Sequence, residues 1–179
     1  DGIIYYIDFP VSTMIPIFGK EFGFKTASLE SVLKCEHKYW SRYEQRNIIP
    51  EHVPLFQAFD PFEDNVIERI EIKYPFWVKP VKSFSSYLGF RINNKSDFIL
   101  ATSVIKKNIG RFSDPFNYML DMVQMPHGVA EVRGDYCIAE DIIGGRQCTQ
   151  EGYCYEGVVE VYATIDSFRE PYLPSFSSY

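Results

Sequence analysis

Apolar residues follow two spacings along the chain, one typical of helices and one typical of strands. Stretches in which they recur every three to four positions predict helices. These stretches cover residues 11–22, 29–46, 97–108 and 116–124, with a shorter one at 63–70. Ser28 precedes the second stretch and Ser96 the third, at positions where a serine side chain caps the first turn of a helix.

Short apolar runs between these stretches predict strands. They cover residues 2–7, 53–59, 76–80, 89–93, 136–143, 147–155 and 158–165. The runs at 76–80 and 89–93 are joined by a turn rich in serine and glycine, which is too short for the crossover that parallel strands need. We therefore expect an antiparallel sheet containing 76–80, 89–93, 136–143, 147–155 and 158–165, with the helix at 97–108 packed across it.

The order of these elements predicts an α+β fold, in which helices pack on an antiparallel sheet. The strand at 2–7 and the helix at 11–22 look like the last β–α unit of an open α/β domain. Such a pair is not stable alone, so we expect the chain to be a fragment of a longer protein. The expected parts are the end of that domain, a helical subdomain, a sheet subdomain and a linker, at residues 1–27, 28–75, 76–166 and 167–179.

Composition places the chain among folded globular proteins. Of its 179 residues, 46% are apolar and 23% are charged, which excludes a disordered, collagen-like or coiled-coil chain. The 15 Phe, 13 Tyr and 2 Trp residues can build a large core. A net charge of −6 gives no general electrostatic attraction to nucleic acid, so we expect no nucleic-acid partner.

The sequence also bears on location. No apolar run approaches the ~18–20 residues that span a bilayer, and no leader-like segment follows Asp1. We therefore expect no membrane partner and a cytoplasmic location. The four cysteines match no zinc pattern and no Cys-x-x-Cys motif, and we expect them to be reduced. They are Cys35, Cys137, Cys148 and Cys154.

Two positions at strand ends are candidates for chemistry. Lys79 ends an apolar strand just before the serine-rich turn, where its ammonium could meet an anion together with backbone N–H groups. The alternative is a strand-end lysine that extends to water. Glu140 and Asp141 end another apolar run, and a buried carboxylate needs a donor. For Glu140 this donor could be Lys79, a backbone amide or the amino group of a purine.

Lys34, Lys38 and Arg42 are spaced four residues apart and predict a basic ridge along one helix face. A solvated face with a Glu30–Lys34 pair is the simpler interpretation of this ridge. Other catalytic patterns are missing from the sequence: it has no Walker phosphate loop, no Gly-x-Ser-x-Gly elbow and no histidine at metal-ligand spacing.

Taken together, these motifs resemble the ATP-grasp superfamily over about residues 28–166. Pro75-Phe76-Trp77-Val78-Lys79-Pro80 is similar to its Pro-φ-φ-Val-Lys-Pro strand, and the serine-rich turn is similar to its phosphate loop. Ile138-Ala139-Glu140-Asp141-Ile142-Ile143-Gly144-Gly145 resembles its adenine-binding hinge, and Cys35-Glu36-His37-Lys38 its Asp-Lys step. The group that includes biotin carboxylase and carbamoyl phosphate synthetase is the expected relative.

The resemblance implies roles for individual residues. Lys38 and Lys79 would contact the ATP phosphates, and Ser85 and Ser86 would cover them. Glu140 would accept from the adenine amino group, with Asp141, Ile142 and Ile143 completing the hinge beside the ring. Gln147 stands where the family often has a glutamate on the ribose. The loop holds only Gly89, where the family usually has two or three glycines.

The resemblance further implies an ATP- and Mg²⁺-dependent ligase that activates a small carboxylate as an acyl phosphate for attack by an amine or other nucleophile. Its Mg²⁺ ligands would lie beyond Tyr179, so no metal ligand or catalytic residue is assigned, and we expect the fragment to be inactive and to bind ATP weakly. Activation of bicarbonate and a non-catalytic nucleotide-binding or interaction module are the alternatives. An oligomer remains possible.

Overall fold

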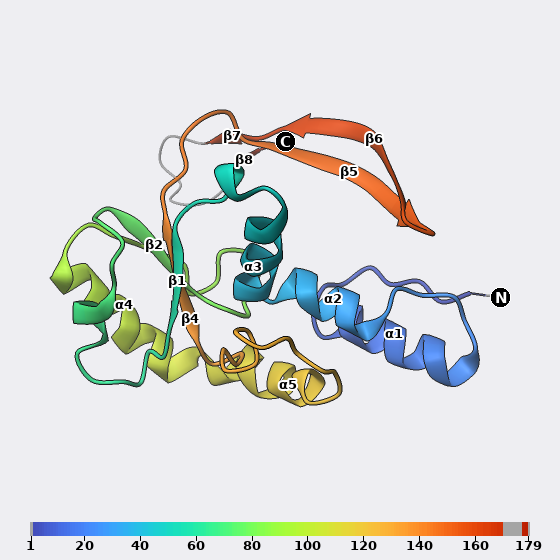
Figure 1. Cartoon of the computed structure of the whole chain (residues 1–179), viewed down its shortest axis with the longest axis horizontal. Coiled ribbons are helices and arrows are strands. Elements are labelled where there is room, and N and C mark those ends of the chain that lie inside the picture. Colours follow the sequence, from blue (N-terminus) through green and yellow to red (C-terminus); the bar gives the residue numbers. More distant parts are fainter. Residues whose placement is uncertain (1, 170–176, 179) are drawn as a thin grey trace. The chain divides into compact units, whose positions relative to one another are not determined.

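The computed structural model describes residues 2–169 and 177–178 (Figure 1). The chain divides into two compact units, Asp1–Ile142 and Ile143–Tyr179. Each unit is described by itself below.

The first unit is built around a four-stranded antiparallel sheet. Its strands are β1 (Phe56–Phe59), β2 (Phe76–Pro80), β3 (Phe90–Ile92) and β4 (Cys137–Asp141), in the order β1-β4-β2-β3. The predicted strands at 76–80, 89–93 and 136–143 are therefore confirmed as antiparallel neighbours, the last two in shorter form. The predicted strand at 53–59 supplies the edge strand β1, which we had not assigned to this sheet.

One face of the sheet carries the apolar core, because side chains alternate between the two faces of a strand. Phe76 and Val78 from β2 and Ala139 from β4 lie on this face and are almost fully buried. The helix α4 (Lys95–Asn108) covers them with Phe98 and Ile105. Helix packing across the sheet is thus confirmed. The cap of α4 is Asn94 rather than Ser96, since the Asn94 side chain accepts from the N–H of Asp97 at 2.9 Å.

The predicted helix at 29–46 is two helices, α2 (Leu29–Glu36) and α3 (Lys38–Ile48). His37 between them has an extended backbone conformation, with φ −83° and ψ 99°. Helical periodicity runs through the break because both helices turn an apolar side into the same cluster. A 3-10 turn, Pro50–His52, follows α3, and another, Val66–Arg69, stands where the short helix at 63–70 was expected.

A second apolar cluster joins these helices to α1 (Val11–Phe22) and α5 (Gly110–Leu120). Its buried members are Phe9, Leu33, Trp40, Phe116, Leu120 and Val129. The start and end predicted for the helix at 116–124 are wrong: α5 begins at Gly110 and ends at Leu120. Pro115 is the sixth residue of α5, and because proline has no N–H it cannot donate to the carbonyl of Arg111, four residues before it.

The strand predicted at 2–7 is also wrong, because none of these residues pairs with a described strand. Ile4, Tyr6 and Ile7 are largely exposed. An apolar run becomes a strand only where a neighbouring strand accepts its backbone hydrogen bonds. The helix predicted at 11–22 is confirmed as α1.

The second unit is a long hairpin, β5 (Cys148–Tyr155) and β6 (Val158–Asp166), followed by a pairing of β7 (Phe168–Arg169) with β8 (Ser177–Ser178). Glu156 and Gly157 turn the hairpin with positive φ values of 49° and 81°. Both strands were predicted, but they form a two-stranded sheet of their own rather than part of the four-stranded sheet. Alternation predicts a strand, whereas sheet membership depends on partners that it does not reveal.

Candidate functional site

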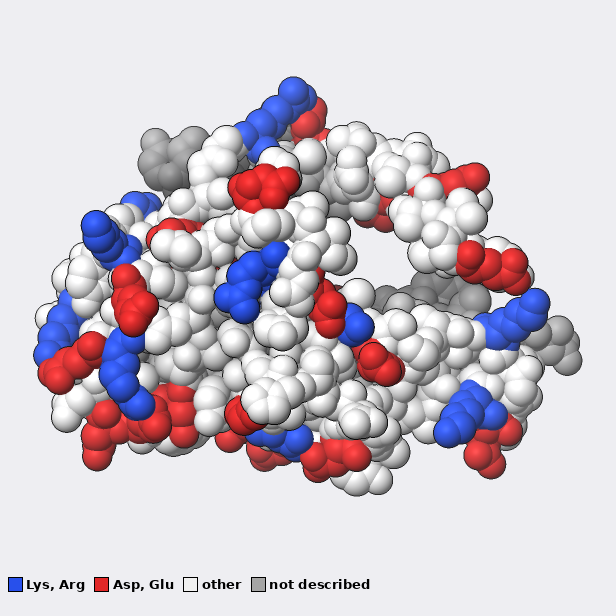
Figure 2. Space-filling view, viewed as in Figure 1, with Lys and Arg blue, Asp and Glu red and all other residues white. Residues whose placement is uncertain are grey.

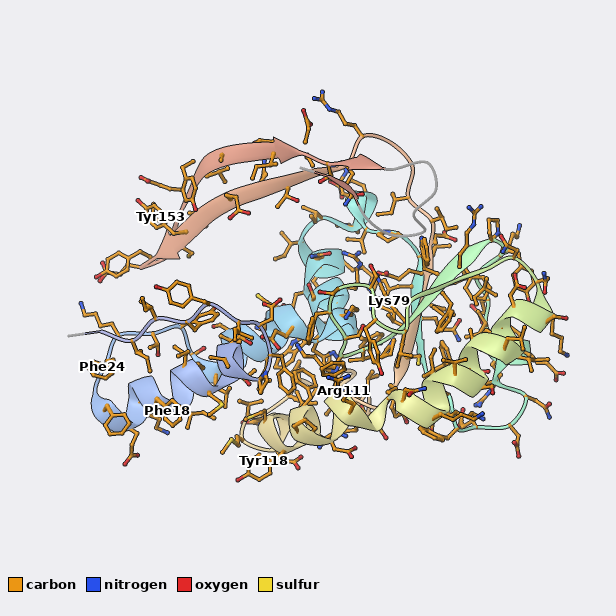
Figure 3. The ribbon with its side chains drawn as sticks, turned by 180° about the vertical axis from the view of Figure 1, so that it is seen from behind. Phe18, Phe24, Lys79, Arg111, Tyr118 and Tyr153 are labelled. Atoms are coloured by element: carbon orange, nitrogen blue, oxygen red, sulfur yellow. The ribbon has the colours of Figure 1, made fainter. Side chains whose placement is uncertain are left out.

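The second face of the four-stranded sheet carries a pair of opposite charges. In the register of β2 and β4, Trp77 stands opposite Glu140 and Lys79 stands opposite Ile138, so all four side chains share this face. Lys79, labelled in Figure 3, forms an ion pair with Oε2 of Glu140. Of the three donors considered for Glu140, Lys79 is therefore one that contacts it in the structure.

A second cation holds the same carboxylate. Arg42 projects from α3 and donates from Nε to Oε1 of Glu140 at 2.5 Å. The Glu140 side chain is only 5% exposed. Burial alone would raise the pKa of this carboxyl, but Lys79 and Arg42 together hold the pKa below its ordinary value. Glu140 is therefore a buried, ionised carboxylate with a cation on each oxygen.

Lys38 stands beside this pair, in the first turn of α3. Its backbone N–H donates to the carbonyl of Val81 at 3.1 Å, and its Nζ donates to the carbonyl oxygen of Ser83 and, at 3.1 Å, to Ser83 Oγ. Burial, reinforced by the charges of Lys79 and Lys82, lowers the pKa of Lys38 to about 7. Within the described part of the chain, no carboxylate forms an ion pair with Lys38, so neutral oxygens alone contact its ammonium.

His37 explains why Lys38 begins a helix. The His37 ring is fully buried; its Nδ1 accepts from the N–H of Trp40 at 3.0 Å, which caps α3, while Nε2 lies 2.8 Å from the carbonyl of Val132. With Nδ1 accepting, Nε2 carries the proton and donates. Burial lowers the pKa of His37 to about 4, so the ring is neutral near pH 7. The helix break therefore points Lys38 toward the end of β2.

A third lysine anchors the chain just after β2. Lys82 is 4% exposed and pairs with Glu36, which also accepts from the hydroxyl of Ser12. Its ammonium lies 4.5 Å from the ring centre of Phe9 and 5.3 Å from that of Phe116. Burial lowers the pKa of Lys82, against the influence of Glu36. These contacts tie the segment that carries Ser83 to α1, α2 and α5.

The serine-rich turn predicted as a phosphate loop follows this anchor. Ser85 and Ser86 are exposed and have left-handed backbone conformations, with φ values of 49° and 57°. Serine adopts this region at a cost of ~1–2 kcal/mol. Phe84 and Tyr87 pack against Phe112 of α5, with ring centres 5.0 and 5.3 Å away. The loop is thus held at its base by aromatic contacts, and it presents the two serines to solvent.

The remaining predicted hinge residues are divided between the two units, with Asp141 and Ile142 in the first and Ile143 and Gln147 in the second. Asp141 stands opposite Phe76 in the register, which places it on the other face from Glu140. Ile142 follows the end of β4. Ile143 and Gln147 belong to the second unit, where both are exposed and the carbonyl of Gln147 accepts from the N–H of Ser167 at 3.0 Å. Their contacts with adenine and ribose remain predictions.

The basic ridge divides into two parts. Lys34 fits the simpler interpretation of a solvated helix face with ion pairs. Its Nζ lies 3.7 Å from Oε1 of Glu30 and 3.5 Å from Oε1 of Glu44, and it also lies over the ring of Trp40. Lys38 and Arg42 instead converge on the sheet. Arg42 and Ser83 are not among the site residues that the sequence predicts. The four-residue spacing from Lys38 was the available signal for Arg42, because it puts both side chains on one helix face.

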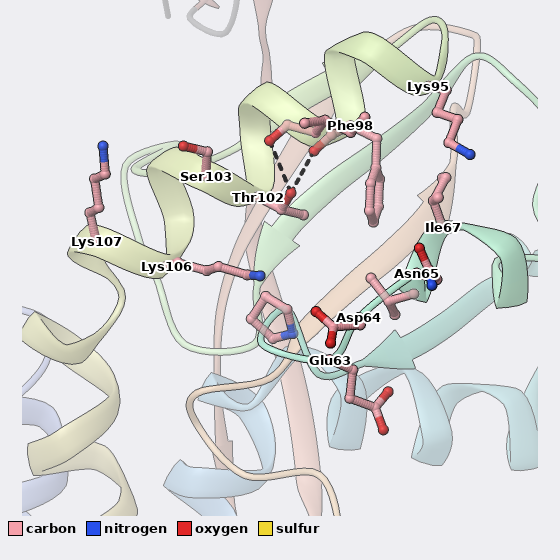
Figure 4. Close-up of a pocket in the computed structure, with 13 residues that line it drawn as sticks. Glu63, Asp64, Asn65, Ile67, Lys95, Phe98, Thr102, Ser103, Lys106 and Lys107 are labelled. Atoms are coloured by element: carbon pink, nitrogen blue, oxygen red, sulfur yellow. Dashed lines mark hydrogen bonds between the residues drawn. The ribbon is translucent and has the colours of Figure 1, made fainter.

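A cleft of about 430 Å³ lies elsewhere in the first unit, between α4 and the segment 61–67 (Figure 4). Both signs of charge line it: Lys106 extends into it from α4, and Asp64 faces it from the loop. Thr102 at its wall is satisfied by the carbonyls of Phe98 and Ile99, at 2.8 and 3.1 Å. None of the predicted site residues lines this cleft.

Other features narrow the chemistry of the described residues. None of their His, Cys, Asp and Glu side chains gather in a group of three or more that could hold a metal ion. Burial raises the pKa of the Cys137 thiol, and the four cysteines are free. In this part of the chain no helix combines the length and apolarity of a membrane span. Lys and Arg are interspersed with Asp and Glu on the face seen in Figure 2.

Comparison with known proteins finds structural relatives only. No protein-family model and no curated protein matches the sequence. The L-amino acid ligase from Bacillus licheniformis matches with a TM-score of 0.65 and 17% identity, covering 89% of this chain and 33% of that one. D-alanyl-alanine synthetase A from Vibrio cholerae matches with a TM-score of 0.63 and 11% identity, covering 95% and 48%.

The D-alanine-D-alanine ligase from Helicobacter pylori matches with a TM-score of 0.55 and 15% identity, covering 93% of this chain and 45% of that one. The chain thus spans about a third to a half of the length of these structures. At such low identity the likeness concerns the fold. This chain has the fold of ATP-grasp enzymes over the part of that fold that it spans.

Proposed function

We propose that this chain contributes the phosphate- and adenine-binding side of the ATP site in an ATP-grasp ligase. The whole protein would phosphorylate a small carboxylate with MgATP and pass the acyl group to an amine or other nucleophile. The structural relatives include an L-amino acid ligase and a D-alanine-D-alanine ligase, which supports this class of reaction.

The observation that carries the proposal is the gathering of Lys38 and Lys79 beside the loop that follows β2. Lys38 has no ion-pair partner among the described carboxylates, and it lies in the first turn of a helix, where the macrodipole disfavours a cation. A bound polyphosphate would supply the missing negative charge. Two neighbouring lysines without enough matching negative charge destabilise a protein that binds no anion. The arrangement is therefore better suited to an anion-binding site.

Each residue then has a chemical task. Lys38 and Lys79 would offset the charge that develops on the transferring phosphoryl group. Ser85 and Ser86 would donate from hydroxyls and backbone amides to the phosphate oxygens. Glu140 would accept from the adenine amino group. Ile143 would meet the adenine ring, and Gln147 the ribose hydroxyls.

Magnesium, when bound with ATP, would offset part of the negative charge of the phosphates. The described residues offer no group of three or more donors that could hold it, so none of them is proposed as a magnesium ligand. In the reaction, a carboxylate oxygen attacks the γ-phosphorus and ADP leaves. The nucleophile then attacks the acyl carbon of the acyl phosphate, and inorganic phosphate leaves.

The test is a trapping assay with the full-length protein. MgATP is supplied with single amino acids and simple carboxylates, and hydroxylamine replaces the amine, so that an acyl phosphate is captured as a hydroxamate. We expect ADP and hydroxamate to form together with at least one carboxylate. Lys79→Met is expected to lower the rate ~100-fold, whereas Lys107→Met, an exposed lysine on α4, serves as the matched control.

Other outcomes would contradict the proposal. ADP formed with bicarbonate and with no other carboxylate would assign the protein to bicarbonate activation. Nucleotide binding without ADP formation under any condition would make it a non-catalytic module.

A further inference from the structure

The proposed function leaves one close contact of the site unexplained. Glu140 has a cation on each oxygen, Arg42 on Oε1 and Lys79 on Oε2. Arg42 is itself held in place, because its Nη1 donates to Gln45 Oε1 at 2.7 Å, and Gln45 in turn donates to Ser41 Oγ at 3.4 Å. The proposed function does not require the guanidinium of Arg42 to contact the nucleotide.

The two roles proposed for Lys79 and Glu140 conflict with the contact seen between them. Lys79 is needed by the phosphates and Glu140 by the base, yet here each is the partner of the other. When phosphate oxygens take Lys79, Glu140 loses one of its two cations. A carboxylate that is 5% exposed tends to take up a proton when it has no cation. Arg42 is the cation that stays with it.

We infer that Arg42 is a positioning residue that keeps Glu140 ionised and aimed at the base when a nucleotide takes Lys79, and that it thereby selects adenine over guanine. This inference rests on the proposed function. An arginine suits the task because its guanidinium stays protonated at any working pH. With Oε1 held by Arg42, Oε2 is left free to accept.

The selectivity follows from the hydrogen-bonding edge of each base. Adenine presents an amino group at position 6, which donates to an ionised carboxylate. Guanine presents a carbonyl oxygen there, and two acceptors facing each other repel. A protonated Glu140 could donate to that carbonyl instead. Loss of Arg42 should therefore reduce the preference for ATP over GTP, rather than lower the affinity for all nucleotides equally.

The experiment measures dissociation constants of ATP, GTP and tripolyphosphate for the full-length protein, each as the magnesium complex. We expect Arg42→Met to raise the dissociation constant of ATP about tenfold. This is the effect of losing one charged hydrogen bond, here the bond from the adenine amino group to Glu140. The dissociation constants of GTP and tripolyphosphate should change less than ~threefold, since neither ligand accepts or donates a hydrogen bond that needs an ionised Glu140. Arg42→Lys keeps the charge and should restore most of the ATP preference.

Controls separate this role from a structural one. Arg46→Met removes an exposed arginine from the same helix, where it lies over Tyr43 and Phe56, and should leave the ATP-to-GTP ratio unchanged. Arg42→Gln is the second neutral variant if Arg42→Met does not fold. In a Glu140→Gln background, Arg42→Met should have little further effect on the ratio, because it acts through the carboxylate.

The outcomes distinguish this inference from the proposed function. Equal weakening of ATP, GTP and tripolyphosphate by Arg42→Met would make Arg42 a direct phosphate ligand and overturn the inference alone. Unchanged dissociation constants for all three ligands would show that Arg42 has only a structural role, and would also overturn the inference. A wild-type protein that binds none of the three would overturn the proposed function and the inference with it.

Discussion

Lys79 and Glu140 form a diagonal pair on neighbouring antiparallel strands. Glu140 stands opposite Trp77, two residues before Lys79, so the lysine reaches back along its strand to the carboxylate. Diagonal neighbours on one sheet face are within reach of long side chains. The pair therefore depends on strand register: a slip of one residue would send Lys79 to the apolar face that α4 covers.

Lys38 should make stability depend on pH in the alkaline range. Its pKa is lowered from 10.5 to about 7 by burial and by Lys79 and Lys82. Between these values the unfolded chain binds more protons than the folded chain, so the free energy of unfolding rises with pH. Relative to Lys38→Met, the wild type should gain ~1–2 kcal/mol between pH 7 and pH 9, after allowance for partial exposure.

Urea unfolding at the two pH values measures this difference. Lys107→Met, at an exposed position on α4, should follow the wild type. Parallel curves for the wild type and Lys38→Met would mean that the Lys38 ammonium is not disfavoured in the folded state.

His37 should make the fold sensitive to acid. Its pKa is lowered by burial from 6.5 to about 4. The contribution of the neutral ring is fully present above pH 6.5 and is lost as pH falls toward 4, by up to ~3 kcal/mol. His37→Asn keeps a capping oxygen for α3 but does not titrate. It should be less stable than the wild type at pH 7 and show a flatter profile between pH 6.5 and 4.5.

The exposed histidine His52 provides the control for this measurement. His52→Asn is expected to retain the wild-type dependence on pH. If His37→Asn also retains it, the buried ring is not the group that titrates.

In the sheets, the sequence pattern predicts where strands lie but does not predict which strands pair. The strand at 76–80 could be predicted to the residue, because an apolar run between Tyr74-Pro75 and Pro80 has sharp limits. The hairpin at 147–165 was recognised as two strands, but alternation carries no information about which sheet a strand joins. The apolar run at 2–7 failed for the same reason, since its pattern suits a strand whether or not a partner is present.

The site shows a similar limit. Lys79 and Glu140 were found because each stands at the end of an apolar strand, where a charge is unusual. The helix break at His37 could not be foreseen, since it depends on a hydrogen bond to the carbonyl of Val132, 95 residues away. Without that break Arg42 appeared as one residue of a solvated ridge.

Phe112 should control the mobility of the loop after β2. Phe84 and Tyr87 pack against its ring, and each aromatic pair contributes ~0.5–1.5 kcal/mol. Phe112→Leu is therefore expected to speed amide hydrogen exchange about tenfold at Tyr87 and Gly89, whose N–H groups close the turns of the loop. Exchange in β2 should change much less.

Tyr118 lies on the same helix, α5, and points to solvent (Figure 3). Tyr118→Leu therefore provides the matched control, with loop exchange as in the wild type. Equal exchange in Phe112→Leu and the wild type would show that the turns hold the loop without the aromatic contacts.

The most direct test of the account is calorimetric titration of the full-length protein with MgATP and with AMP, for the wild type and Lys79→Ala. The proposed site predicts that the substitution weakens MgATP by ~1.5–3 kcal/mol, which is tenfold or more. AMP lacks the β- and γ-phosphates, so Lys79→Ala should lower the affinity for AMP less than the affinity for MgATP. Tight MgATP binding that Lys79→Ala leaves unchanged would show that the ATP site lies elsewhere.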